Sequence, residues 1–190
     1  MPLLVAFVGG DVGAWSIESL APVVGEGLPP APRLDVVESP AARAPGAAWE
    51  LRGVTSNERY LTRAELHTLR AVQEPLGRPA STRAALIPIT KSEAWWELAQ
   101  DERRRIFEET SHHVAVGLRY LPAVARRLHH GRDLGEPFDF LTWFEYAPEH
   151  ADDFEHLVDL LREGPEWRYV VREVDLRLSR AERRPDNSRR

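Results

Sequence analysis

His113 and Arg126 are the two residues whose positions in the sequence most clearly suggest chemistry. On a helix that turns about 100° per residue, His113 projects about 20° from Ile106, on the apolar stripe, whereas His112 projects about 120° away on the other side. His113 is therefore the histidine of this pair that is expected to face the interior. A lone histidine on an apolar face is most often a structural residue, and that alternative stays open here.

Arg126 follows Pro122, the residue that ends the preceding helical pattern. In an extended chain Val124, Arg126 and Leu128 share one face, so Arg126 points the same way as two aliphatic neighbours. A buried guanidinium stays protonated and needs a carboxylate, a backbone carbonyl or an anionic ligand. An ordinary salt bridge and an anion-binding role carry equal weight at this point.

Other constellations in the sequence are weaker. Lys91, Trp95 and Trp96 predict either a basic and aromatic wall or a core tryptophan pair beside a solvated lysine. Glu109 and His112 repeat one piece of a di-iron spacing, but the other glutamates of such a site are missing. The H-E-x-x-H, G-x-S-x-G, G-x-G-x-x-G and P-loop motifs are absent from the sequence. Three further polar residues are unremarkable when taken alone: Tyr60, Gln73 and Glu166.

The composition narrows the classes of function. The chain has 190 residues, no cysteine and a single methionine, Met1, which excludes disulfides, thiolate ligands and an internal methionine ligand. The net charge of −5 provides no overall positive field for nucleic acid or anionic lipid. The sequence has no apolar run of about 18 residues and no signal-peptide pattern. We therefore expect a cytoplasmic protein with no nucleic-acid partner and no membrane partner.

Apolar runs and turn residues predict a small αβ unit in the first half of the chain. The predicted elements are a strand at 3–8, a Pro- and Gly-rich loop over 23–48, a strand at 48–54, and a helix at 62–73 capped by Thr62. This N-terminal half is taken as residues 1–83.

The second half, residues 84–179, has a clearer pattern. The predicted elements are a strand at 84–89, a long helix at 92–120 capped by Ser92, strands at 124–130 and 138–146, a helix from Pro148 to Gly164, and a strand at 169–178. The order β-α-β-β-α-β predicts an α+β fold with a ferredoxin-like antiparallel sheet and helices on one face. The charged tail, 180–190, is predicted to be disordered.

Several segments together resemble the chlorite dismutase family. They are Gly9–Trp15, Lys91–Trp96, Ser111–His113, Leu121–Arg126, Pro137–Glu145, and Glu166–Trp167 with Val174–Leu178. The small N-terminal half is similar to the short, dimeric branch of that family. The resemblance covers nearly the whole chain except the 23–48 loop and the tail, and several motifs in one order are more specific than any of them alone.

The resemblance implies a dimeric α+β barrel that binds haem b and converts chlorite to chloride and dioxygen. By this likeness His113 is the proximal iron ligand, Arg126 is the distal residue, and Glu166 accepts the second ring N–H of His113. The resemblance also implies that Gln73 holds Arg126 and that Lys91, Trp95 and Trp96 lie around the haem edge. Leu121 would line the distal side, and Tyr60 would contact a propionate.

The implied mechanism gives Arg126 the central task. Chlorite is an anion and the protein carries net negative charge, so a local cation must attract the substrate. Arg126 would also retain the hypochlorite fragment until the oxygen–oxygen bond forms. Alternatives are a decarboxylase of coproporphyrin-type haem, a haem-binding carrier, or a ferredoxin-like dimer without cofactor. The expected partners are the chlorite anion and a second copy of the chain, as a homodimer.

Overall fold

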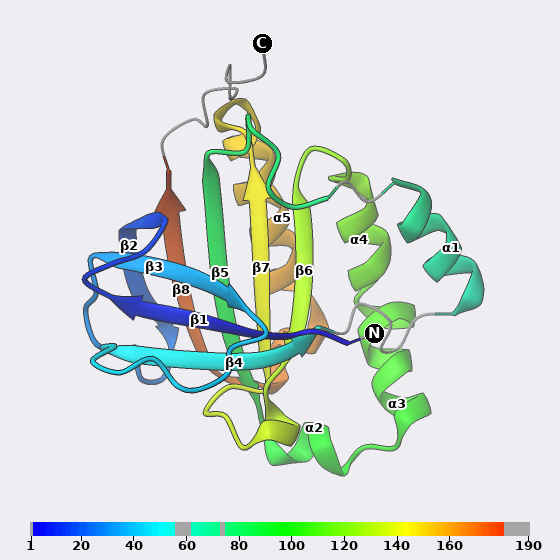
Figure 1. The fold of residues 1–190 in the computed structure, drawn as a ribbon. Helices are drawn as coiled ribbons and strands as arrows, with labels where there is room; N and C mark the ends of the chain where they lie inside the picture. The colour runs from blue at the N-terminus through cyan, green and yellow to red at the C-terminus, as the bar shows by residue number, and fades with distance from the viewer. Residues whose placement is uncertain (1, 56–61, 73–74, 181–190) are drawn as a thin grey trace.

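A closed antiparallel barrel of eight strands organises the part of the chain that the computed structural model describes, residues 2–55, 62–72 and 75–180 (Figure 1). The strands are β1 (Leu4–Gly10), β2 (Trp15–Val24), β3 (Arg33–Glu38), β4 (Trp49–Thr55), β5 (Arg83–Lys91), β6 (Ala125–His130), β7 (Phe140–Tyr146) and β8 (Val170–Ser179). Around the barrel their order is β1-β3-β2-β8-β5-β7-β6-β4, and β4 returns to β1.

The second half of the chain has the expected ferredoxin-like arrangement. Its four strands lie in the order β8-β5-β7-β6 in the sheet. Strand β5, which comes first along the chain, pairs antiparallel with both β7 and β8. Helix α5 (Ala151–Glu163) covers the outer face of this sheet (Figure 1). The α+β class and the antiparallel sheet predicted from the sequence are therefore confirmed.

The two halves of the chain share one barrel. Strand β2 of the first half pairs with β8 of the second, and β4 pairs with β6. The predicted strands at 3–8 and 48–54 and the helix after Thr62 are present, the helix as α1 (Arg63–Val72). Thr62 and Glu65 cap α1 reciprocally, since each backbone N–H donates to the other side chain, at 2.6 and 3.3 Å.

The prediction of a loop over 23–48 is wrong for residues Arg33–Glu38. Strand β3 lies there and pairs with β1 along its whole length, from Val5 opposite Glu38 to Gly10 opposite Arg33. The neighbouring Pro and Gly residues conceal a short strand whose Leu34 is completely buried in the barrel. Pairing with a distant strand supplies hydrogen bonds and burial that a local pattern does not reveal.

The single long helix predicted at 92–120 is also wrong. The chain forms α2 (Glu93–Glu97), α3 (Gln100–Arg104), a π-helical turn η1 (Arg105–Thr110) and α4 (His113–Arg119). Extended backbone at Leu98 and Ala99 separates the first two, and His112, with φ of 52°, separates the last two. Ser92 takes the N-cap position of α2 without a capping side-chain hydrogen bond.

Two apolar cores lie on opposite faces of the same strands. The barrel interior is filled by aromatic and aliphatic side chains, with Phe7 and Trp143 at its centre. The second core lies between the outer face of the sheet and α4 and α5, where Phe144 packs on Phe154. Within the described ranges no helix is long and apolar enough to cross a membrane.

Candidate functional site

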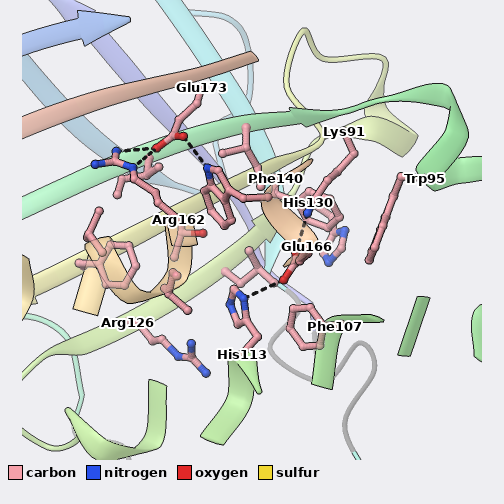
Figure 2. A pocket seen from close by; sticks show the side chains of 18 residues that line it. Lys91, Trp95, Phe107, His113, Arg126, His130, Phe140, Arg162, Glu166 and Glu173 are labelled. Atoms are coloured by element: carbon pink, nitrogen blue, oxygen red, sulfur yellow. Dashed lines mark hydrogen bonds and ion pairs between the residues drawn. The ribbon is translucent and has the colours of Figure 1, made fainter. Parts of the chain in front are cut away.

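A cavity lies in this second core, between the outer face of the sheet and the helices α4 and α5 (Figure 2). Its volume is about 90 Å³, and all the empty space out to its open mouth amounts to about 810 Å³. Most of its wall is apolar: Ile87, Ile89, Trp95, Phe107, Leu128, Phe140, Phe144, Val158, Leu161 and Trp167. The polar side chains on the wall are Lys91, His113, Arg126, His130, Thr142, Arg162, Glu166 and Glu173. A large apolar cavity with a few convergent polar groups is typical of a ligand or cofactor site.

Strand alternation determines which residues of β6 reach the cavity. Arg126, Leu128 and His130 line it, whereas Arg127 pairs with Glu38 at 3.0 Å on the other side of the strand. The shared face of Arg126 and Leu128 was predictable from the two-residue period of a strand. Figure 2 shows His113 of α4 and Arg126 of β6 among the side chains that line the cavity.

His113 is the first residue of α4, and its ring lies inside the cavity. Its Nδ1 is 3.0 Å from Oε2 of Glu166, and its ring stacks on Phe107 with 4.4 Å between centroids. His112 is exposed, so the expected difference between the two histidines is present. The reason differs from the helical projection, because the left-handed backbone of His112 starts a new helix at His113.

Glu166 is a buried carboxylate shared by two nitrogen donors. Its Oε1 is 2.6 Å from Nζ of Lys91 and its Oε2 faces His113, while its own backbone N–H donates to Ser111 Oγ. Burial alone would raise the pKa of Glu166, but the charges and hydrogen bonds of His113 and Lys91 outweigh burial and hold it at about 2. In the tautomer that donates its Nδ1 proton to this carboxylate, the His113 ring would present the lone pair of Nε2.

Lys91 lies deeper than the expected position at a haem edge suggests. Its Nζ is almost fully buried, points at Glu166, and sits 4.6 Å from the centroid of the Trp95 ring. Burial lowers the pKa of Lys91, and the charge of Glu166 opposes that shift. The structure therefore connects Lys91 to His113 through one carboxylate.

Of the other residues implied by the resemblance, only some line the cavity. Trp95 is buried and lines the cavity, whereas Trp96 stacks on Phe140 and donates its Nε1–H to Asp139 at 3.1 Å, outside the lining that the described residues form. Leu121 is half-buried and also lies outside that lining. Two implied residues fall outside the described ranges: Tyr60 and Gln73.

Arg126 reaches from β6 toward the backbone of α4. A side-chain carbon at Gly117 would lie only 2.7 Å from Nη1 of Arg126, so the guanidinium rests against this glycine. Burial lowers the pKa of Arg126, and the carboxylate of Glu108 acts in the opposite direction. Glu108 in turn accepts the N–H of Val114 at 2.7 Å, in the first turn of α4.

A buried ion-pair network at one end of the cavity was missed by the sequence analysis. Arg162 donates to Glu173 at 2.8 Å and to Asp175 at 2.7 Å, and Trp167 Nε1 donates to Glu173 at 2.8 Å. Val174 and Leu176 of β8 face the barrel interior, so their neighbours Glu173 and Asp175 lie on the outer face of the sheet. That outer face is covered by α5, so polar residues there are buried and paired.

Metal binding through a cluster of side chains is not a feature of this site. No group of three or more His, Cys, Asp or Glu residues that could hold a metal ion occurs among residues 2–55, 62–72 and 75–180.

The fold and the cavity define an α+β barrel protein with a ligand site between sheet and helices. A family model described as chlorite dismutase matches residues 35–181, and the chain belongs to this family. A crystal structure of a dimeric chlorite dismutase from Nitrobacter winogradskyi is 61% identical with a TM-score of 0.86, covering 93% of this chain and 99% of the other.

More distant relatives match in part. The chlorite dismutase of Ideonella dechloratans is 35% identical over 89 residues, which are 47% of this chain and 29% of the relative. The chain thus matches less than a third of that relative's length. A chlorite dismutase structure from Candidatus Nitrospira defluvii is 21% identical and shares the fold, with a TM-score of 0.61. The match covers 93% of this chain and 91% of that chain.

Proposed function

We propose that this protein binds haem b and converts chlorite to chloride and dioxygen. The observation that carries the proposal is the pairing of His113 with the ionised Glu166 on the wall of an apolar cavity that also holds Arg126. The reaction balances without another reactant, since the two oxygen atoms of ClO₂⁻ leave as O₂ and chlorine leaves as Cl⁻.

The residues present fit a haem group. The cavity is walled by aromatic and aliphatic side chains, as a flat apolar macrocycle requires. The sequence offers no cysteine and no internal methionine, so a histidine is the natural axial ligand for non-covalent haem. His113 Nε2 would hold the iron. When bound, haem supplies the iron centre that exchanges electrons with chlorite.

Glu166 and Lys91 support the ligand rather than the substrate. The carboxylate of Glu166 keeps the Nδ1 proton on His113, which determines the tautomer and makes Nε2 a stronger donor. The ammonium of Lys91, 2.6 Å from the same carboxylate, keeps it ionised in spite of its burial.

Arg126 is the residue that handles the substrate anion. A planar guanidinium offers several N–H donors and a permanent positive charge, which suits a small oxyanion in a protein of net negative charge. The same contact would hold the chlorine-containing fragment of the substrate in the cavity until the oxygen–oxygen bond forms. Solvent then has little opportunity to carry the fragment away.

The assembly we propose is a homodimer, and its support is the Nitrobacter winogradskyi relative that is itself described as dimeric. A cytoplasmic location stays a prediction from the sequence. The decarboxylase and carrier alternatives are not favoured, since the family model and the matched relatives are chlorite dismutases.

The proposal is tested with purified protein loaded with haem b. Addition of chlorite in an oxygen-electrode cell should release one O₂ per chlorite consumed, with a Soret band confirming loading beforehand. Protein without haem is the control and should release none. A protein that shows the Soret band of bound haem but releases no oxygen would rule out this function and leave haem carriage as the alternative.

A further inference from the structure

Gly117 occupies an unusual place for a glycine. It lies inside helix α4 with ordinary helical backbone and is buried. Glycine in a helix interior is less stable than alanine because it loses more backbone freedom on folding. No left-handed conformation requires a glycine at this position. The reason for glycine must therefore be space.

The space at Gly117 is taken by Arg126. A carbon built at the Cβ position would lie 2.7 Å from Nη1, 3.0 Å from Cζ and 3.2 Å from Nη2 of Arg126. These are its three nearest heavy atoms, and all belong to the guanidinium. Ordinary contacts of such a carbon are longer than 3.4 Å, so any side chain at residue 117 would force the guanidinium to move.

Helix α4 thus carries two parts of the site one turn apart. His113 and Gly117 are four positions apart and lie on the same side of the helix. The first presents its ring to the cavity, and the second leaves a recess for the guanidinium that comes from β6. Glu108, bonded to the first turn of α4, adds a negative charge that draws Arg126 toward the same helix.

We propose that Gly117 is a positioning residue for Arg126, whose missing side chain sets the distance between the guanidinium and an anion bound in the cavity. Gly117 itself touches no substrate. The inference rests on the proposed function only in taking chlorite as that anion. A side chain at residue 117 would displace the guanidinium from α4, so its donors would no longer meet the anion in their present geometry.

The test uses Gly117→Ala in haem-loaded protein with nitrite, a bent triatomic monoanion like chlorite, as the probe. Titration followed by the Soret shift gives the dissociation constant of nitrite. We expect it to rise about tenfold in the variant, the factor that follows from losing one hydrogen bond to a charged group. Equal constants in the parent and the variant would overturn the inference.

The matched control is the same substitution in an Arg126→Ala background. There the added methyl group meets no guanidinium, so Gly117→Ala should leave the dissociation constant of nitrite unchanged. An equal rise in both backgrounds would show a general disturbance of α4 and would refute positioning through Arg126.

A measurement without haem keeps this inference distinct from the proposed function. In the haem-free protein, urea unfolding should show a larger stabilisation by Gly117→Ala in the Arg126→Ala background than in the parent, because only the parent contains the clash. Additive effects of the two substitutions would overturn the inference. A parent protein that takes up no haem would instead refute the proposed function and leave this result standing.

Discussion

Glu166 illustrates how much one buried carboxylate can do at the scale of a residue. It receives hydrogen bonds from an ammonium and an imidazole that approach from β5 and α4. Removing its charge would leave Lys91 buried without a counterion and His113 without its Nδ1 acceptor. Both losses would weaken the support of His113 as a ligand.

Glu166→Gln is expected to weaken haem retention. The amide keeps the shape of the side chain but accepts the Nδ1 proton of His113 less strongly, so affinity should fall about 10- to 100-fold. Haem transfer to an excess of apomyoglobin measures the loss rate. The control is Glu163→Gln, an exposed glutamate at the end of α5, which should transfer haem at the parental rate.

Arg126→Lys should retain haem but keep the substrate fragment poorly. Lysine carries the charge without the planar fork, so fewer donors hold the oxyanion. We expect less dioxygen per haem before inactivation, and more hypochlorite captured by an added thioether. Parental values of both quantities would mean that Arg126 serves as a structural ion-pair residue.

At the scale of elements, the break between η1 and α4 decides which histidine enters the cavity. The left-handed residue His112 ends one helical segment and directs His113 inward. Apolar periodicity could predict that residues 92–120 are largely helical, but the pattern assumes one continuous helix. Glu108 spans the break at His112, because its carboxylate accepts the N–H of Val114 beyond it.

His113→Ala should abolish stable haem binding, whereas His112→Ala should leave it unchanged. Only the first residue lies on the cavity wall, and the second is exposed at the helix start. Absorbance titration with haem measures occupancy. Equal occupancy in both variants would remove His113 from the role of ligand.

The same contrast shows what the sequence could predict of the site. Arg126 was predictable from strand alternation, because β6 is regular and Arg126 shares a face with Leu128. Glu173 and Arg162 were not, because their pairing depends on α5 covering the outer face of β8, which no local pattern reports. Glu166 became a candidate only through the family resemblance, since its partners lie 53 and 75 residues away.

At the scale of the whole molecule, the barrel interior contains a buried titratable group. His129 is 1% exposed, and its Nδ1 lies 3.0 Å from the carbonyl oxygen of Leu141, while its ring meets the edge of Phe7. Burial lowers the pKa of His129 from 6.5 to about 4. The hydrogen bond to Leu141 and the charge of Glu38 oppose the shift, and Arg127 adds to it.

Acid should therefore weaken the barrel between pH 6.5 and about 4. In this range the unfolded chain binds a proton at His129 and the folded chain does not, so the free energy of unfolding falls as the pH falls. The full effect is about 3 kcal/mol. Urea unfolding at several pH values measures it, and His129→Phe should flatten this slope. Exposed His67→Phe is the control, and an unchanged slope in His129→Phe would contradict the assignment.

Closure of the barrel also limits how copies of this chain can associate. Each of the eight described strands has a neighbour on both sides, so none is an open edge strand along its whole length. Two seams are narrow, β2 with β3 and β4 with β6, and each joins only two residue pairs. Strand exchange between molecules would have to open one of these seams first. A dimer that adds no strand at these seams would use side chains on the faces, loops or helices of the barrel.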